Sequence, residues 1–336
     1  MSSNSRTPHT DPASVAKAIE DLGARLVTVK QSIGQIIYGQ ETVIEQTLIT
    51  LLAGGHALLI GVPGLAKTKL VETMGSVFGL DDKRIQCTPD LMPADIIGAE
   101  VLEEKQDGEH YFRFIRGPVF AQLLMADEIN RASPRTQSAL LQAMQERRVS
   151  VAGQYHDLPS PFHVLATQNP LEQEGTYPLP EAQLDRFLLQ IDVAYPDEAA
   201  EKRMLLITTT EDTPQPAAVM TPHELLDAQK LLRQMPIPES VVDAILRLVR
   251  AGRPASSDVD DVMSYVAWGP GPRASQSLLL ASRARAALEG RLAPSVDDVL
   301  ALAKPILRHR MALNFAARAE GMTIDAIIDI LCEPLQ

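Results

Sequence analysis

Residues 61–68 have the composition of a loop that binds phosphate groups. The stretch Gly61-Val-Pro-Gly-Leu-Ala-Lys67-Thr68 lies between an apolar run and the start of a helical pattern. Backbone N–H groups of such a loop, at a helix N-terminus, bind anionic phosphates. In this motif the lysine reaches the β- and γ-phosphates of a nucleotide, and the threonine hydroxyl holds Mg²⁺. The candidate nucleotide-binding residues are Gly61, Pro63, Gly64, Leu65, Ala66, Lys67, Thr68 and Lys69.

The residue before the lysine departs from the usual pattern, which has glycine at that position. Ala66 stands there in this chain. Alanine can serve if the position does not need a positive φ, and on that condition we expect a functional loop. The alternative is a surface turn that happens to contain Lys-Thr.

Two acids follow a second apolar run, in the stretch Leu123-Leu-Met-Ala-Asp127-Glu128. The end of a buried strand is a costly place for carboxylates unless a cation or a proton transfer uses them. We therefore predict that Asp127 binds Mg²⁺ and that Glu128 polarises the attacking water. The alternative is that Asp127 caps the helix that follows.

A third predicted strand, Val164-Leu-Ala-Thr-Gln-Asn169, ends in an uncharged polar residue. Beside the two acids, this amide would orient the same water or contact the γ-phosphate. Asn-Pro is also a common turn pair, so Asn169 alone is weak support.

The sequence lacks the patterns of other catalytic sites. Its seven histidines include no His-x-x-x-His pair, which argues against zinc, and it has no Gly-x-Ser-x-Gly elbow. An Asn-Lys-x-Asp element for guanine is also missing, which favours ATP over GTP. Cys87 and Cys332 are too few for a disulfide framework, as expected in a reducing cytoplasm.

Composition limits the class of protein. A length of 336 residues favours two domains. The net charge of −12 argues against nucleic-acid binding, which depends on Lys and Arg. The polar N-terminus is not a secretory signal, and the most apolar stretch, 47–66, is punctuated by Gly, His and Pro. We expect a cytoplasmic protein with no membrane insertion.

The chemistry-bearing residues need a parallel sheet to bring them together. The apolar runs 57–60, 123–126 and 164–167 are typical of buried parallel strands, and 70–78 and 137–147 have helical periodicity. This pattern predicts a doubly wound α/β domain over 11–196, opened by a helix that packs on its own domain. Inserts at about 90–116 and 148–158 should each contain a hairpin.

The pattern changes after residue 196. Residues 197–222 are predicted to be a linker, and 1–10 a disordered tail. A capping box at Thr221 and Glu224 begins a helix, and further helices are expected at about 239–251, 273–289, 295–310 and 323–332, with no convincing strand. The second domain, 223–336, should be an all-helical bundle. Its basic residues suggest a solvated face or a subunit contact: Arg273, Arg283, Arg285, Arg291, Lys304, Arg308 and Arg310.

The order of these motifs resembles the AAA+ ATPases and, more narrowly, the MoxR family. The similar stretches are the phosphate loop, Asp-Glu-Ile-Asn-Arg-Ala at 127–132, Ala-Thr-Gln-Asn-Pro at 166–170 and Glu-Ala-Gln-Leu-Asp-Arg-Phe at 181–187. Members of that family have alanine before the loop lysine. The resemblance implies a P-loop ATPase domain with a helical lid, nucleotide bound between them, and Mg²⁺-dependent ATP hydrolysis.

The resemblance also implies roles for single residues. Arg186 matches the arginine finger that one subunit supplies to its neighbour's nucleotide. Arg273 matches the sensor arginine that the lid brings onto the γ-phosphate. Tyr38 and Gly39, with Ile37 and Gln40 beside them, fall where family members contact adenine.

The family further suggests a homo-oligomer, a hexameric ring, working as a chaperone-like motor on a client complex. A partner with a von Willebrand factor A-type domain is often involved. Two alternatives stay open from the sequence: a motor that acts on nucleic acid, and a nucleotide-gated scaffold in which hydrolysis is incidental.

Overall fold

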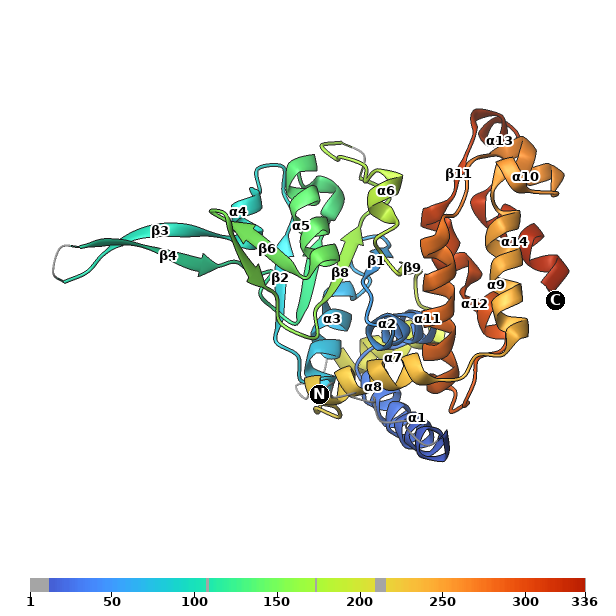
Figure 1. Ribbon diagram of the computed structural model, residues 1–336, viewed down its shortest axis with the longest axis horizontal. Helices are drawn as coiled ribbons and strands as arrows, with labels where there is room; N and C mark the ends of the chain where they lie inside the picture. Colours follow the sequence, from blue (N-terminus) through green and yellow to red (C-terminus); the bar gives the residue numbers. More distant parts are fainter. Residues whose placement is uncertain (1–11, 107–108, 173, 209–215, 336) are drawn as a thin grey trace, which may run out of the picture.

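The computed structural model describes residues 12–106, 109–172, 174–208 and 216–335. An α/β domain forms its centre, a long hairpin projects from one side, and a helical lid stands on the other (Figure 1). Among the described residues, no helix is both long enough and apolar enough to cross a membrane.

The central sheet has five parallel strands in the order β2-β5-β8-β1-β9. The three apolar runs form its middle, which confirms the predicted parallel α/β sheet. The two outer strands were not predicted. The strands are β1 (Ala57–Ile60), β2 (Asp82–Gln86), β5 (Leu123–Asp127), β8 (His163–Gln168) and β9 (Leu189–Asp192).

Helices cover both faces of this sheet. The long N-terminal helix α1 packs against elements of both domains, including α3 and α11. It therefore docks on its own chain, as its apolar face predicts. The helices of the α/β domain are α1 (Pro12–Gly34), α2 (Glu41–Leu52), α3 (Lys67–Val77), α4 (Pro93–Ile97), α5 (Pro134–Glu146) and α6 (Glu181–Leu184).

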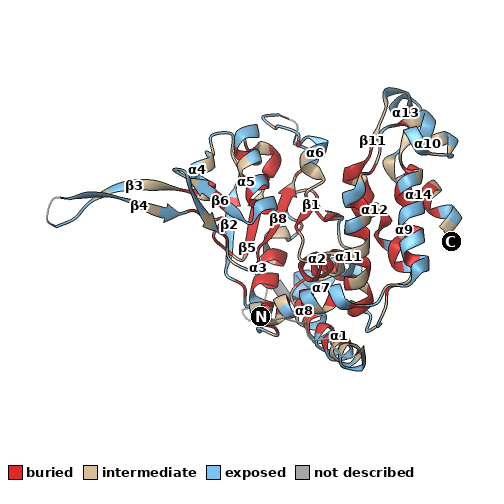
Figure 2. Ribbon diagram, viewed as in Figure 1, coloured by how far each residue is buried: buried red, intermediate tan, exposed pale blue. Residues whose placement is uncertain are grey.

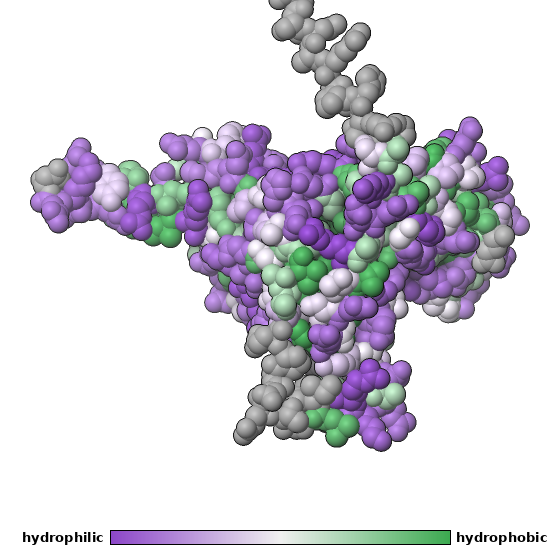
Figure 3. Space-filling view, turned by 90° about the horizontal axis from the view of Figure 1, so that it is seen from below, coloured by the Kyte–Doolittle hydropathy of each residue, from purple (hydrophilic) through white to green (hydrophobic). Residues whose placement is uncertain are grey.

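Both predicted inserts contain hairpins. In the first, β3 (Gly98–Glu104) pairs with β4 (His110–Arg116), and in the second β6 (Arg148–Val151) pairs with β7 (Gln154–Asp157). The first hairpin projects far from the body and shows hydrophobic side chains among hydrophilic ones (Figure 3). Its exposed apolar residues are Val101, Leu102, Phe112 and Ile115.

The lid is helical, but two predictions for residues 197–336 are wrong, one about the linker and one about the absence of strands. Helix α7 (Glu198–Thr208) lies within the segment 197–222, which was predicted to be a linker. The lid also contains two strands, β10 (Val266–Trp268) and β11 (Ala312–Leu313), which pair antiparallel and are too short to show an alternating pattern. The lid helices are α8 (Pro222–Gln234), α9 (Glu239–Ala251), α10 (Asp260–Tyr265), α11 (Pro272–Leu288), α12 (Val296–Leu307), α13 (Phe315–Ala319) and α14 (Ile324–Cys332).

The two faces of the sheet belong to different apolar cores. Leu58, Leu124 and Val164 point to one core, which α5 covers. Their neighbours on the opposite face join a second core that continues into the lid helices. Buried residues accordingly run from the sheet into the lid in Figure 2. The lid is therefore packed firmly on one face of the α/β domain.

Candidate active site

The carboxyl ends of the parallel strands β1, β5 and β8 meet at one edge of the sheet, where open α/β sheets bind ligands. A cavity of about 480 Å³ lies there. It is lined by most of the residues that the sequence singled out: Pro63, Gly64, Leu65, Ala66, Lys67, Thr68, Lys69, Asp127, Glu128 and Asn169. Arg84 and Gln86 of β2 also line it, and the sequence analysis missed both.

The loop backbone has the shape of an anion-binding concavity. Gly64 has φ +87° and Ala66 has φ +55°. We expected alanine to serve only if this position did not need a positive φ. That expectation is wrong, because Ala66 does take a positive φ. For an L-residue the left-handed region costs about 1–2 kcal/mol. The strained residue, Ala66, lies directly before helix α3, whose first N–H groups face the loop.

The first glycine of the motif has a packing role instead. A Cβ at Gly61 would lie 2.7 Å from the carbonyl oxygen of Val193, at the end of β9. Gly61 does not line the cavity, so it serves the loop by letting β9 approach closely.

Lys67 points its ammonium back into the loop, where it donates to the carbonyl oxygens of Gly61 and Val62. Burial lowers the pKa of Lys67, while the charges of Asp127 and Glu128 act in the opposite direction. Lys67 thus faces two carboxylates across the cavity.

The two acids are fixed by one hydroxyl. Thr167 Oγ1 donates to Asp127 Oδ1 at 2.5 Å and accepts from the Glu128 N–H at 2.9 Å. Gln86 Nε2 donates to Glu128 Oε2 at 2.9 Å, and Arg131 donates to the same oxygen at 3.1 Å. The 3₁₀ turn Ile129–Arg131 that follows has Glu128 at its N-cap position, and the next α-helix, α5, is capped by Ser133, so Asp127 is not a helix cap.

A divalent cation of the magnesium type fits this arrangement. The described residues contain no group of three or more His, Cys, Asp and Glu side chains that could hold a metal ion. Mg²⁺ usually takes only one or two protein carboxylates together with substrate phosphates. Thr68 and Asp127 line the same cavity and supply oxygens of the right kind.

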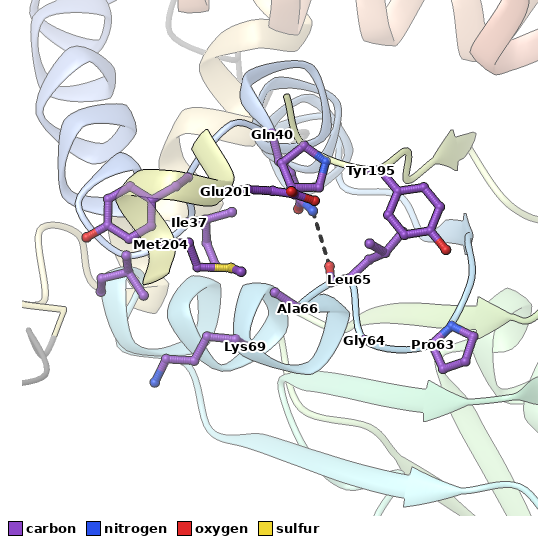
Figure 4. Close-up of a pocket in the computed structure, with 13 residues that line it drawn as sticks. Ile37, Gln40, Pro63, Gly64, Leu65, Ala66, Lys69, Tyr195, Glu201 and Met204 are labelled. Atoms are coloured by element: carbon purple, nitrogen blue, oxygen red, sulfur yellow. Dashed lines mark hydrogen bonds between the residues drawn. The ribbon is translucent and has the colours of Figure 1, made fainter. Parts of the chain in front are cut away.

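A second cavity, of about 380 Å³, adjoins the first and shares Pro63 to Ala66 and Lys69 with it. Figure 4 shows its apolar walls. Gln40 Nε2 donates to the Leu65 carbonyl at 3.2 Å, while Gln40 Oε1 is buried without a partner. The cavity therefore offers apolar surface and an unpaired buried amide oxygen, which suit a purine base. Its other lining residues are Ile36, Ile37, Tyr38, Tyr195, Pro196, Glu201 and Met204.

Helix α7, and not the lid, closes this second cavity. Glu201 and Met204 come from α7, and no residue beyond it lines either cavity. The residues that line the two cavities therefore come from the α/β domain and α7, and the expected position of a nucleotide between the domain and the lid stays a prediction. Gly39, with φ +64°, allows the close approach of α7, because a Cβ there would lie 2.2 Å from the Ala200 Cβ.

Arg186 and Arg273 lie elsewhere, together. They line a separate cavity of about 240 Å³ with residues 54–56, which precede β1, and Leu188, which precedes β9. This is the amino edge of the sheet, so the length of β1 separates both arginines from the phosphate loop of their own chain. The lid does not bring Arg273 to that loop.

The surroundings of Arg186 offer little opposite charge. Burial lowers the pKa of Arg186, and the neighbouring charge of Arg273 lowers it further, while Glu146 acts less strongly to raise it. The Nε of Arg186 is buried without a hydrogen-bond partner, and Arg273 lies 3.6 Å from the Asp185 carboxylate.

The basic residues of the lid do not form the solvated face that the sequence suggested. Arg285 and Arg291 pair with the fully buried Asp298. Arg308 pairs with Asp325, while Arg310 is itself only 1% exposed. Of the others, Lys304 pairs with Asp329, Arg273 with Asp185, and Arg283 donates to the Met235 carbonyl.

Comparisons with known proteins cover both domains. A family model described as "ATPase family associated with various cellular activities (AAA)" matches residues 56–189, and one described as "AAA lid domain" matches 260–331. The chain is 43% identical over 314 residues to "Chaperone MoxR1" of Mycobacterium tuberculosis, covering 92% of this chain and 82% of that protein. It is 32% identical over 333 residues to "Protein MoxR" of Paracoccus denitrificans, covering 93% and 96%.

A solved structure has the same fold. A crystal structure of a protein from Cytophaga hutchinsonii, assigned as an ATPase, matches with a TM-score of 0.87 and 37% identity. The match covers 95% of this chain and 96% of that one. The likeness therefore extends over the lid as well as the α/β domain.

Proposed function

The chain belongs to the MoxR family of AAA+ ATPases, as its motifs predicted, and we propose that it hydrolyses ATP with Mg²⁺ at the carboxyl edge of its sheet. One observation supports this proposal above the others. A single cavity is lined by Lys67, Thr68, Asp127 and Glu128, and it adjoins an apolar cavity of a size that suits a base.

Each side chain then has a role in phosphoryl transfer. The loop N–H groups and Lys67 bind the phosphates, and Thr68 and Asp127 hold Mg²⁺, which neutralises phosphate charge when bound. Glu128 accepts hydrogen bonds only through Oε2 among the contacts described, which leaves Oε1 to accept the proton of the attacking water. Asn169, which lines the same cavity, orients that water.

We propose that Arg186 and Arg273 act together on the nucleotide of the neighbouring subunit. Phosphoryl transfer needs cations on the developing negative charge, and neither arginine is near its own phosphate loop. The pair lies at the edge of the sheet opposite that loop. A head-to-tail contact would therefore bring the pair of one subunit to the loop of the next, and such contacts close into rings. A hexamer is the ring we expect from the family.

The cellular role follows from family membership. The relative in Mycobacterium tuberculosis is named a chaperone, and we propose that this chain remodels or activates a client complex in the cytoplasm. A protein with a von Willebrand factor A-type domain is the partner that we expect.

Lys67→Ala tests the nucleotide site. Isothermal titration with ATP and Mg²⁺ should show no binding, because the cation that faces the phosphates is lost. Lys230→Ala, an exposed lysine of α8, is the matched control and should bind normally. ATP affinity near the wild-type value in Lys67→Ala would overturn the site.

A further inference from the structure

We propose that Arg310 of the lid is a positioning residue that holds the Arg186 segment in place, so that the lid controls how one subunit serves its neighbour's nucleotide. The inference rests on the proposed role of Arg186 in trans. It concerns residues 185–188, which connect α6 to β9, and the 3₁₀ turn Arg308–Arg310 that follows α12.

The guanidinium of Arg310 contacts this segment along its whole length. Its Nε donates to Asp185 Oδ1 at 2.8 Å, and Nη2 donates to the carbonyls of Phe187 and Asp185 at 2.6 and 3.3 Å. Nη1 donates to the Leu188 carbonyl at 3.2 Å. These donors come from one rigid, planar group, so they fix the backbone on both sides of Arg186.

The same group is tied to the lid. Arg310 also donates to the Ile306 carbonyl at 2.7 Å and to Ser277 Oγ at 3.1 Å. His309, the preceding residue, contacts the Phe187 carbonyl through Nε2 at 3.1 Å. Helices α11 and α12 and the residues around Arg186 therefore share one hydrogen-bond network.

Arg186 depends on this network because its own side chain has little else to orient it. Its Nε is buried without a partner, and its neighbour Arg273 repels it. A buried cation is costly unless it is paired and hydrogen-bonded, and the buried cation here is Arg310. Its partner is Asp185, whose carboxylate also lies 3.6 Å from Arg273. The carboxylate of Asp185, the residue that precedes Arg186, thus contacts two arginines of the lid.

The first variant is Arg310→Gln, with Arg308→Gln as the matched control. Arg308 belongs to the same turn and bridges Asp325 and Asp192, but it does not contact residues 185–188. Arg310→Gln should bind ATP with a Kd within about threefold of wild type, because its phosphate loop is intact. Its kcat should fall about 10²-fold, since a displacement of about 1 Å at a reacting group costs that much. Arg308→Gln should keep both values.

Mixed rings separate positioning from a general structural defect. Arg310→Gln mixed with Lys67→Ala should regain activity, because Lys67→Ala supplies a well-placed Arg186 to a subunit that binds ATP. Arg310→Gln mixed with Arg186→Ala should show no gain over the separate variants, because no interface then has a well-placed finger. If Arg310 instead supports its own subunit's ATP site, the pattern reverses, and that result overturns the inference.

Two further measurements keep the inference falsifiable. Asp185→Asn retains the shape of the carboxylate and should show the same rescue pattern with a smaller fall in kcat. This variant replaces Arg310→Gln as the test if Arg310→Gln does not fold. Wild-type kcat in both variants overturns the inference. The mixture of Arg186→Ala with Lys67→Ala is the reference. If this mixture shows no rescue, the proposed function of Arg186 fails. If it shows rescue and the mixture of Arg310→Gln with Lys67→Ala does not, only the role of Arg310 is rejected.

Discussion

The guanidinium of Arg84 lies 2.5 Å from the carboxylate of Asp127 on the neighbouring strand. On the other side, the hydroxyl of Thr167 donates to the second carboxylate oxygen. Strands β2 and β8 therefore both hold the acid that ends β5. The protein itself therefore sets the position of this carboxylate.

Glu128→Gln should bind ATP at least as tightly as wild type and fail to hydrolyse it. The amide keeps the shape of the side chain and removes the charge that accepts a proton from water, so the loss should be in kcat. Equilibrium binding and a steady-state phosphate-release assay measure the two properties. Hydrolysis near the wild-type rate would mean that another group is the base.

Ala66→Gly should keep ATP binding and not lower the melting temperature, whereas Ala66→Val should lower both. The φ of +55° strains alanine, suits glycine and is much worse for a β-branched side chain. Thermal melts and ATP titrations check this. Equal tolerance of valine and glycine would contradict the positive φ.

Stability should fall as the pH decreases below about 6.5. Burial lowers the pKa of His56 to about 3 and that of His163 to about 4. The unfolded chain, with histidine pKa values near 6.5, therefore binds more protons than the folded one between pH 6.5 and 4. Each histidine then removes up to about 1.4 kcal/mol per pH unit.

His163→Gln tests this dependence. Urea unfolding at several pH values should give a shallower loss between pH 6.5 and 5 than in wild type, even where stability at pH 7 is reduced. His223→Gln, which changes an exposed histidine, should leave the slope unchanged. A wild-type slope in His163→Gln would reject the assignment.

The sequence revealed those strands that contain a run of buried, mainly apolar residues. Strands β1, β5 and β8 lie inside the sheet, with helices on both faces. Strands buried in this way have near-continuous apolar sequences, which can be recognised directly. Strand β2 lies at the edge of the sheet and buries only Ile85 of its five residues. It therefore gives no apolar run, and Arg84 and Gln86 were missed with it.

The site residues divide in a similar way. Lys67, Thr68, Asp127 and Glu128 come from contiguous motifs, which a sequence displays directly. Arg310 could not be found this way, because an arginine in a sequence normally indicates a solvent-exposed position. Only the fold brings it to Asp185, which lies 125 positions away in the chain. Helix α7 was missed because its apolar and charged residues form no clear helical stripe.

The central claim is that a complete ATP site needs Arg186 from one subunit and Lys67 from the next. Arg186→Ala and Lys67→Ala should each be inactive alone. In a mixed ring, some interfaces combine the intact Arg186 of a Lys67→Ala subunit with the intact phosphate loop of an Arg186→Ala subunit.

The decisive measurement is the steady-state ATPase rate against the mixing ratio of these two variants, once exchange of subunits has been verified. A finger arginine contributes about 10³–10⁵ in rate, or roughly 4–7 kcal/mol, so even partial rescue should be plain. The account predicts a maximum at intermediate ratios. A rate that stays at zero in confirmed mixed rings would contradict it.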